Sequence, residues 1–209
     1  SRFDQILYRT KNQSDSFYLN QLDNESKYII LGSIDSADLP IVKDAMGNLK
    51  YLSKYIIVPH EVGSAALEEI ENQLNRIGIK AVHYSKCEDL EEYRVVIVDM
   101  VGILAELYAY SDIAYVGAGF GAGVHSVLEP VAYSNVIGFG PNYQIVDMAV
   151  SLKDKELAQV IQSGKEFAGF LSIMDRKSEL DDLQGKMQQF ITEQKPAGEN
   201  ILKEIFRGD

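Results

Sequence analysis

A glycine-rich run in the middle of the chain is the segment best suited to chemistry. Residues 117–123 carry four glycines in seven positions, and His125 and Ser126 follow. Because glycine has no Cβ, such a backbone can approach a ligand closely and turn N–H groups toward it. An apolar helix is predicted to begin near Val127, and a helix N-terminus can hold an anion such as phosphate. The run therefore predicts an anion-binding loop.

Glu129 lies one turn into this predicted helix. Its carboxylate can accept hydrogen bonds from sugar hydroxyls, or it can be a first-turn acid that interacts with the helix dipole. The glycine-rich run can likewise be a plain strand-to-helix connection, although such connections usually have about 2–6 residues. Both alternatives stay open at this point.

Two histidines follow apolar runs and are candidates for ligand contact. His60 comes after Pro59, and His125 ends the glycine-rich run. Each can also be a structural histidine, which is the expectation for His83 inside its apolar run. The three histidines have no metal-ligand spacing, and no Walker A or Gly-x-Ser-x-Gly motif occurs. We therefore predict no metal site.

The elements that must position these residues are short apolar runs, each ended by a glycine, a proline or a polar residue. They cover 28–31, 55–58, 80–84, 95–98, 113–116 and 136–139. Continuous runs rich in Val and Ile are typical of strands buried on both faces. Helical spacing lies between them, as in 64–77. The alternation predicts an α/β, Rossmann-like, three-layer domain with a mostly parallel sheet of about six strands.

In such a sheet, ligands bind beyond the carboxyl ends of the strands, at the switch point of the topology. The residues that follow the runs are therefore the candidates. They are Gly32, Ser33 and Asp35, then Pro59, His60 and Glu61, then Asp99 and 101–103, then 117–126, and finally 140–142.

Composition excludes several classes of protein. The 209 residues are 46% apolar, which predicts one folded domain over 1–209 and excludes disorder. No stretch approaches the ~18 apolar residues of a membrane span. The net charge of −11, without a basic stripe, argues against broad nucleic-acid binding. A single cysteine excludes a disulfide framework within the chain.

The two ends suggest a piece of a larger protein. The chain begins at Ser1-Arg2-Phe3-Asp4 without an initiator Met or a signal peptide, so we interpret 1–27 as an interdomain junction and first element. After Leu152 the pattern turns helical, and C-terminal helices are expected within 174–209. Their apolar positions are Leu180, Leu183, Met187 and Phe190, and then Ile201, Leu202, Ile205 and Phe206.

Several segments, taken in order, resemble the C-terminal half of 3-deoxy-D-manno-octulosonic acid (Kdo) transferases. They are Arg2-Phe3-Asp4, Gly32-Ser33, Pro59-His60, Asp99-x-x-Gly102-x-Leu104, Val116-Gly117, Gly123-x-His125-x-x-Leu128-Glu129-Pro130 and Gly140-Pro141-Asn142-Tyr143. The segment from Gly123 to Pro130 is the most specific. The resemblance spans residues 2 to about 152.

This resemblance implies one half of a glycosyltransferase-B fold, the half that binds the CMP portion of CMP-Kdo. The whole enzyme would transfer Kdo to a lipid A precursor in lipopolysaccharide biosynthesis, at the cytoplasmic face of the bacterial inner membrane. The family's catalytic base is a Glu of the N-terminal half, which also holds the acceptor site and membrane anchor. No catalytic residue is therefore expected in this chain, and the chain alone is expected to be soluble and inactive. No cofactor is expected beyond the donor nucleotide.

The resemblance also implies which residues contact the donor. Three family segments touch CMP, and they correspond here to Pro59-His60, to Val101-Gly102-Ile103 and to Ser126-Val127-Leu128-Glu129. Ser33, Gly123 and His125 join them as residues at strand ends. The family usually has Glu at position 103, Asn-Pro at 126–127 and often Arg at 60, so this chain is a divergent member in which backbone contacts matter most.

Two alternatives remain. One is another glycosyltransferase-B donor domain that uses a UDP-sugar, since the glycine-rich run and Glu129 suit that donor equally. The other is a non-catalytic Rossmann-like binding module without nucleotide preference. The acidic composition favours a donor-binding half, because lipid A carries phosphates and an acidic domain is a poor platform for that acceptor.

Overall fold

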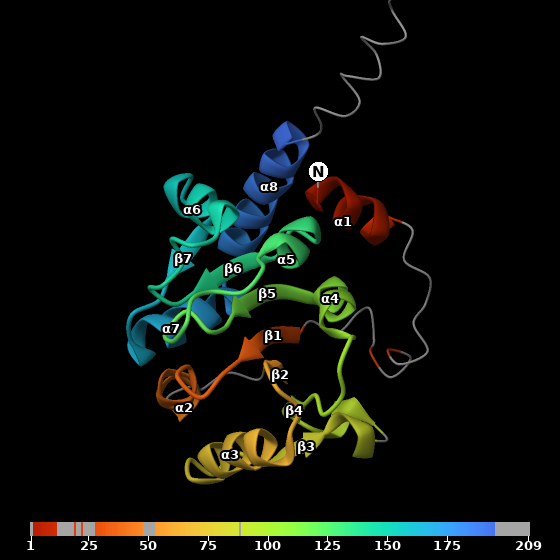
Figure 1. Ribbon diagram of the computed structural model, residues 1–209, viewed down its shortest axis with the longest axis vertical. Helices are drawn as coiled ribbons and strands as arrows, with labels where there is room; N and C mark the ends of the chain where they lie inside the picture. The colour runs from red at the N-terminus through yellow and green to blue at the C-terminus, as the bar shows by residue number, and fades with distance from the viewer. Residues whose placement is uncertain are drawn as a thin grey trace, which may run out of the picture.

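The computed structural model describes residues 2–11, 19, 22, 28–47, 53–87 and 89–194. Within these residues, seven parallel strands form one sheet in the order β3-β4-β2-β1-β5-β6-β7 (Figure 1). The strands are β1 (Tyr28–Ile34), β2 (Lys54–Pro59), β3 (Ala81–His83), β4 (Val95–Ile97), β5 (Ser111–Val116), β6 (Val136–Phe139) and β7 (Ala158–Val160). The predicted α/β class and parallel sheet are confirmed.

Helices cover both faces of the sheet (Figure 1). They are α1 (Arg2–Lys11), α2 (Leu39–Gly47), α3 (Ser64–Asn75), α4 (Leu104–Leu107), α5 (Leu128–Ala132), α6 (Asp147–Asp154), α7 (Gly164–Leu171) and α8 (Lys177–Gln194). Helices α2, α3 and α7 pack on one face, and α1, α4, α5 and α6 pack on the other. Helix α8 contributes buried residues to both sides.

The chain changes direction across the sheet at β1. From β1 it builds outward through β2 to β3 and β4, and after α4 it returns to place β5 on the opposite side of β1. The loops that leave β1 and β5 therefore diverge to opposite faces while starting side by side. This is the topological switch point at which open parallel sheets bind ligands.

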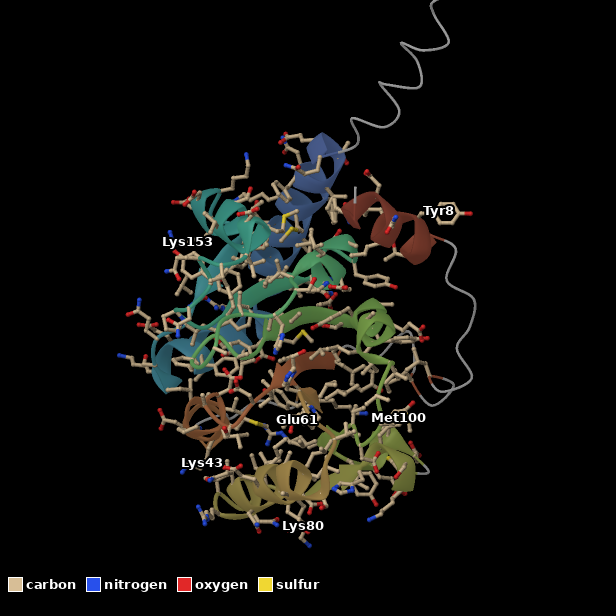
Figure 2. All side chains as sticks on the ribbon, viewed as in Figure 1. Tyr8, Lys43, Glu61, Lys80, Met100 and Lys153 are labelled. Atoms are coloured by element: carbon tan, nitrogen blue, oxygen red, sulfur yellow. The ribbon has the colours of Figure 1, made fainter. Side chains whose placement is uncertain are left out.

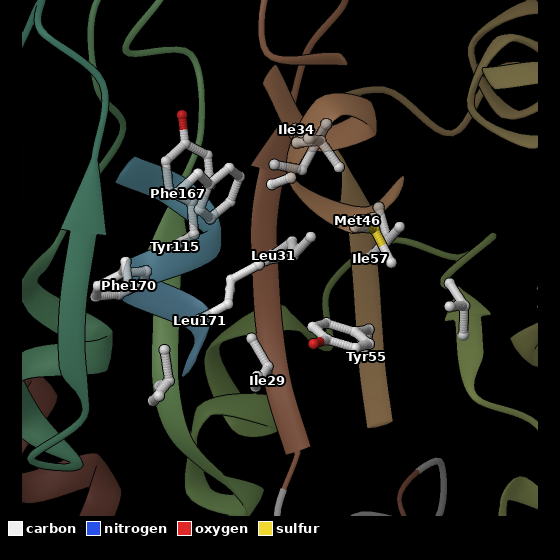
Figure 3. Close-up of a cluster of buried hydrophobic side chains, with 14 of the residues drawn as sticks. Ile29, Leu31, Ile34, Met46, Tyr55, Ile57, Tyr115, Phe167, Phe170 and Leu171 are labelled. Atoms are coloured by element: carbon white, nitrogen blue, oxygen red, sulfur yellow. The ribbon is translucent and has the colours of Figure 1, made fainter. Parts of the chain in front are cut away.

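From Tyr28 to Leu31, strand β1 is apolar because both of its faces are covered. Ile29 and Leu31 face the helices α2, α3 and α7, whereas Tyr28 and Ile30 face the side of α4. Figure 3 shows Ile29 and Leu31 beside Tyr115 and the aromatic rings of α7. Tyr115 and Phe167 pack with ring centroids 4.5 Å apart. The continuous Ile-rich run thus follows from burial on both sides.

The differences from the sequence-based expectation lie at the C-terminal side. β7 is a seventh strand in a stretch that was expected to be helical after Leu152. It has only three residues, all half-buried at the sheet edge, so it is too short to carry a strand period. Helix α8 confirms the first predicted C-terminal helix and buries Leu180, Met187 and Phe190.

The predicted second C-terminal helix, at 201–206, lies outside the described residues, as does most of 12–27. The proposed subdivision at 1–27 and 174–209 stays a prediction. In the part of the chain that the structure describes, no helix combines the length and apolar character needed to cross a bilayer.

Two glycine substitutions test the packing of the sheet. A Cβ on Gly138 of β6 would meet the ring of Phe170 at 2.8 Å, so Gly138→Ala is expected to destabilise the fold by about 1–3 kcal/mol. Gly185 lies on the exposed side of α8 with open space around it, so Gly185→Ala is expected to stabilise by about 0.5–1 kcal/mol. Urea denaturation of both variants measures this; equal effects would contradict the assignment.

Candidate functional site

The predicted site residues meet at one edge of the sheet. They follow β4, β2, β1 and β5, which are adjacent strands in that order. Because the strands are parallel, their carboxyl ends lie on the same side. Figure 2 labels Glu61 and Met100, which stand in the loops after β2 and β4.

His60 and His125 form a stacked pair at this edge. Their ring centroids are 4.4 Å apart with an interplanar angle of 23°. The backbone N–H of His60 donates to the carbonyl of Ile34 at 2.9 Å, and the backbone N–H of His125 donates to the carbonyl of Gly117 at 3.3 Å. The two rings thus come from strands on either side of β1 and meet beyond its end. Burial lowers the pKa of His125, and the neighbouring His60 lowers it further, which favours the neutral imidazole.

The glycine-rich loop is folded tightly on its own backbone. The N–H groups of Gly121 and Gly123 both donate to the carbonyl of Ala118 at 3.0 Å. Gly123 has φ +124°, which requires glycine, and a Cβ on Gly119 would lie 2.6 Å from the amide nitrogen of Gly140. The glycines therefore allow the loop to pack closely on the backbone of Gly140, and several of their amides are hydrogen-bonded within the protein, whereas the sequence predicts an approach to a ligand.

The loop after β6 supports the glycine-rich loop. The Asn142 N–H donates to the carbonyl of Gly119, and the Asn142 side-chain amide donates to that of Gly121, both at 2.9 Å. In return the Val124 N–H donates to the Asn142 carbonyl at 2.9 Å. Asn142, a residue in the predicted strand-end set, is thus a structural partner of the loop.

The start of α5 orients Glu129. The Ser126 hydroxyl donates to Glu129 Oε2 at 2.7 Å, and the Leu128 N–H approaches Ser126 Oγ at 3.4 Å. The Ser-x-x-Glu spacing is that of a capping box, but the N-cap residue is Val127 and no side chain caps the helix, so this bond orients Glu129 only. Val127 is fully buried, and Leu128 packs partly buried beside it. The helix has only five residues, so its dipole is a minor contribution to anion binding.

Glu129 also lies close to the segment after β4. It lines a small pocket together with Ala105 of α4 and with Ile6 and Thr10 of α1. Ala105 follows the 101–103 segment by two residues, so the pocket lies between α5 and the helix that this segment leads into. Within 101–103, Val101 is 78% exposed and Ile103 is buried. Gly102 between them has φ +93°.

Asp99 fixes the beginning of that segment. It accepts hydrogen bonds from the backbone N–H and the hydroxyl of Ser85. Burial alone would raise the pKa of Asp99, but these hydrogen bonds hold it below its usual value. His83 stands between Glu71, 2.8 Å from its Nε2, and Asp99, 3.7 Å from its Nδ1. The structural role expected for His83 agrees with this arrangement.

A cavity of about 370 Å³ opens beside His60, between the loops after β1 and β2. Its polar lining consists of Asp35, Ser36, Glu61 and Glu69 besides His60, and Ile34, Leu39 and Ile70 are among its apolar walls. Carboxylates and apolar walls of this kind suit sugar hydroxyls and the C–H face of a sugar ring. Among the residues described, no three His, Cys, Asp or Glu side chains are grouped so that they can hold a metal ion.

Asp38 is the residue of this edge that the sequence analysis missed. It is fully buried, and its carboxylate accepts hydrogen bonds from the Tyr115 hydroxyl, the Ala118 N–H and the Asp35 N–H at 2.9, 2.7 and 3.1 Å. The available signal was an acidic residue directly before Leu39-Pro40, which indicates a helix start but not burial.

Asp38 makes the stability of the fold depend on pH. Burial, opposed by the two N–H hydrogen bonds, raises its pKa from 3.8 to about 6. The folded protein therefore binds this proton more tightly than the unfolded chain, and the stabilisation is lost as the pH rises from about 4 to about 7. Asp38→Asn removes the titration, so its free energy of unfolding should gain up to about 3 kcal/mol relative to the unmodified protein over that range. Urea denaturation of both proteins at about pH 4 and about pH 7 measures this. The same pH dependence of the free energy of unfolding in the two proteins would contradict it.

Comparison with known proteins agrees with the fold and the sequence motifs. No protein-family model matches the chain. It is 28% identical over 184 residues to a bifunctional glycosyltransferase/methyltransferase of Fusobacterium nucleatum, covering 86% of this chain and 28% of that protein. It is 32% identical over 141 residues to the 3-deoxy-D-manno-octulosonic acid transferase of Chlamydia muridarum, covering 66% of this chain and 32% of that protein. The chain thus spans about a third of the length of these relatives.

A solved structure shares the fold. The C-terminal CMP-Kdo binding domain of WaaA from Acinetobacter baumannii superposes with a TM-score of 0.68, covering 90% of this chain and 97% of that domain at 17% identity. The resemblance inferred from Gly123-x-His125-x-x-Leu128-Glu129-Pro130 is therefore confirmed in sequence, and the Rossmann-like fold is confirmed in structure. The chain is a divergent relative of the 3-deoxy-D-manno-octulosonic acid transferases, with the fold of the C-terminal domain of one of them.

Proposed function

We propose that this chain is the donor-binding half of a glycosyltransferase that transfers Kdo from CMP-Kdo to a lipid A precursor in lipopolysaccharide biosynthesis. One observation carries the proposal. The three segments that the resemblance implies for CMP follow β2, β4 and β5 at one edge of the sheet, beside the switch point. Glu129 of the third segment lines a small pocket together with Ala105, which lies two residues after the second segment.

Each part of the donor has a candidate partner. The Glu129 carboxylate, oriented by Ser126, accepts the ribose hydroxyls. Backbone groups of 101–103 and of Pro59 frame the cytosine. The His60–His125 pair and the backbone around Ser126 lie nearest to the phosphate, so neutral N–H groups rather than lysine or arginine bind it.

The chemistry of transfer requires the rest of the protein. The general base must reach the attacking acceptor hydroxyl, and in a two-domain cleft it comes from the facing half. That half also holds the acceptor and the membrane anchor, which places the whole protein at the cytoplasmic face of the inner membrane. The chain alone binds CMP weakly, needs no metal or further cofactor, and transfers nothing.

Replacing Glu129 tests the ribose contact. Gln keeps an acceptor for the Ser126 hydroxyl but removes the charge, so Glu129→Gln should weaken CMP binding by about tenfold or more in calorimetric titration. Glu68→Gln, on the exposed side of α3, is the matched control and should bind like the unmodified protein. Unchanged affinity in Glu129→Gln would refute the ribose role.

Nucleotide preference separates this proposal from its alternatives. Cytosine presents an amino donor where uracil presents a carbonyl acceptor, so backbone groups at 101–103 can distinguish them. Addition of CMP should raise the melting temperature by ligand stabilisation, whereas UMP and UDP should leave it unchanged. Stabilisation by UDP would favour a UDP-sugar donor domain, and no response to any nucleotide would favour a non-catalytic binding module.

A further inference from the structure

A buried carboxylate joins the two loops at the switch point. Asp38 lies between the turn after β1 and the glycine-rich loop after β5, with no side-chain exposure. Its Oδ2 accepts the N–H groups of Ala118 at 2.7 Å and Asp35 at 3.1 Å. Its Oδ1 accepts the Tyr115 hydroxyl at 2.9 Å. Two of these three donors belong to β5 and the loop that follows it.

The carboxylate holds a strained residue. Ala118 has φ +65°, a left-handed conformation that is strained for an L-residue. Such residues persist where the surroundings over-determine them. A hydrogen bond from an N–H to a charged acceptor is among the stronger hydrogen bonds in proteins and can offset this strain. Asp38 is the acceptor that the Ala118 N–H reaches in this conformation.

The conformation of Ala118 sets the course of the whole loop. Its carbonyl accepts the N–H groups of both Gly121 and Gly123. His125, two residues after Gly123, stacks on His60, and the next residue, Ser126, donates a hydrogen bond to Glu129. A change at Ala118 therefore moves the residues assigned to the donor, although Asp38 itself contacts none of them in the described hydrogen bonds.

Capping of helix α2 does not account for the Asp38 side chain. The backbone carbonyl of Asp38 accepts the first helical bonds, from Ile41 and Val42. The turn before the helix is closed by a different carboxylate, since Asp35 Oδ1 accepts the N–H groups of Ala37 and Asp38. Asp38 directs both carboxylate oxygens away from its own helix, and apart from Asp35 its donors belong to β5 and the glycine-rich loop.

We propose that Asp38 is a positioning residue for donor binding: its carboxylate holds Ala118 in the left-handed conformation and so fixes the loop that carries His125, Ser126 and Glu129. The inference rests on the proposed function for its consequence, the binding of CMP. Its structural half, the fixing of residues 117–124, is independent of any ligand.

Two measurements on Asp38→Ala test the two halves. Hydrogen exchange of residues 117–124 in the ligand-free protein should accelerate by about tenfold or more, and CMP affinity should fall by at least about tenfold. Asp38→Asn keeps an oxygen for the Ala118 N–H and offers its amide to the Tyr115 hydroxyl, so it should retain both properties. Val42→Ala, which removes buried volume from the same helix, should destabilise the protein without either effect.

If Asp38→Ala does not fold, Asp38→Ser is the deciding variant, because serine still suits a helix start but is too short to reach the Ala118 N–H. A folded Ala or Ser variant with normal exchange at 117–124 and normal CMP affinity would overturn the proposal. The proposal would also be overturned if Val42→Ala accelerated exchange at 117–124 and weakened CMP binding as much as Asp38→Ala does. If the unmodified protein does not bind CMP, the proposed function is wrong, and the exchange measurement still decides whether Asp38 fixes the loop.

Discussion

The pairing of β1 with β5 is the interaction on which the rest of the structure depends. Gly32 pairs with Val116 at the end of this ladder, and the Gly117 N–H continues it by donating to the Gly32 carbonyl. A Cβ at Gly117 would collide with the Ser33 carbonyl, so only glycine allows the two strand ends to lie this close. The loop that leaves β5 at this point leads to His125, Ser126 and Glu129, three of the residues assigned to the donor.

Burial and the switch point together explain why polar groups gather at one edge. The central strands are covered on both faces and bury mostly apolar side chains. Hydrogen-bonding residues are therefore displaced to the strand ends, where Asp38, Asp99 and Asn142 each bind the backbone of a neighbouring loop. These contacts make the edge a preformed surface rather than a set of independent loops.

Sequence reasoning predicted the class of fold correctly, because that depends on local patterns, and it selected segments that the structure brings to one edge of the sheet. The Val- and Ile-rich runs predicted the strands, and the glycines of 117–123 predicted a close backbone approach. Sequence reasoning did not predict the contacts between residues that are distant in the sequence. Neither the stacking of His60 on His125 nor the burial of Asp38 leaves a local pattern, since each depends on β1 lying between β2 and β5. The three-residue β7 was too short to show a period.

The cavity beside His60 bears on the ionic conditions under which the proposed donor nucleotide would bind. Asp35, Glu61 and Glu69 line it, no lysine or arginine is among its described lining residues, and the whole chain carries a net charge of −11. An anionic nucleotide therefore approaches against the field of the domain. Added salt screens that repulsion, with a Debye length of about 10 Å at 0.1 M. In this respect the acidic lining differs from sites that hold phosphate with fixed cations, where added salt screens an attraction instead.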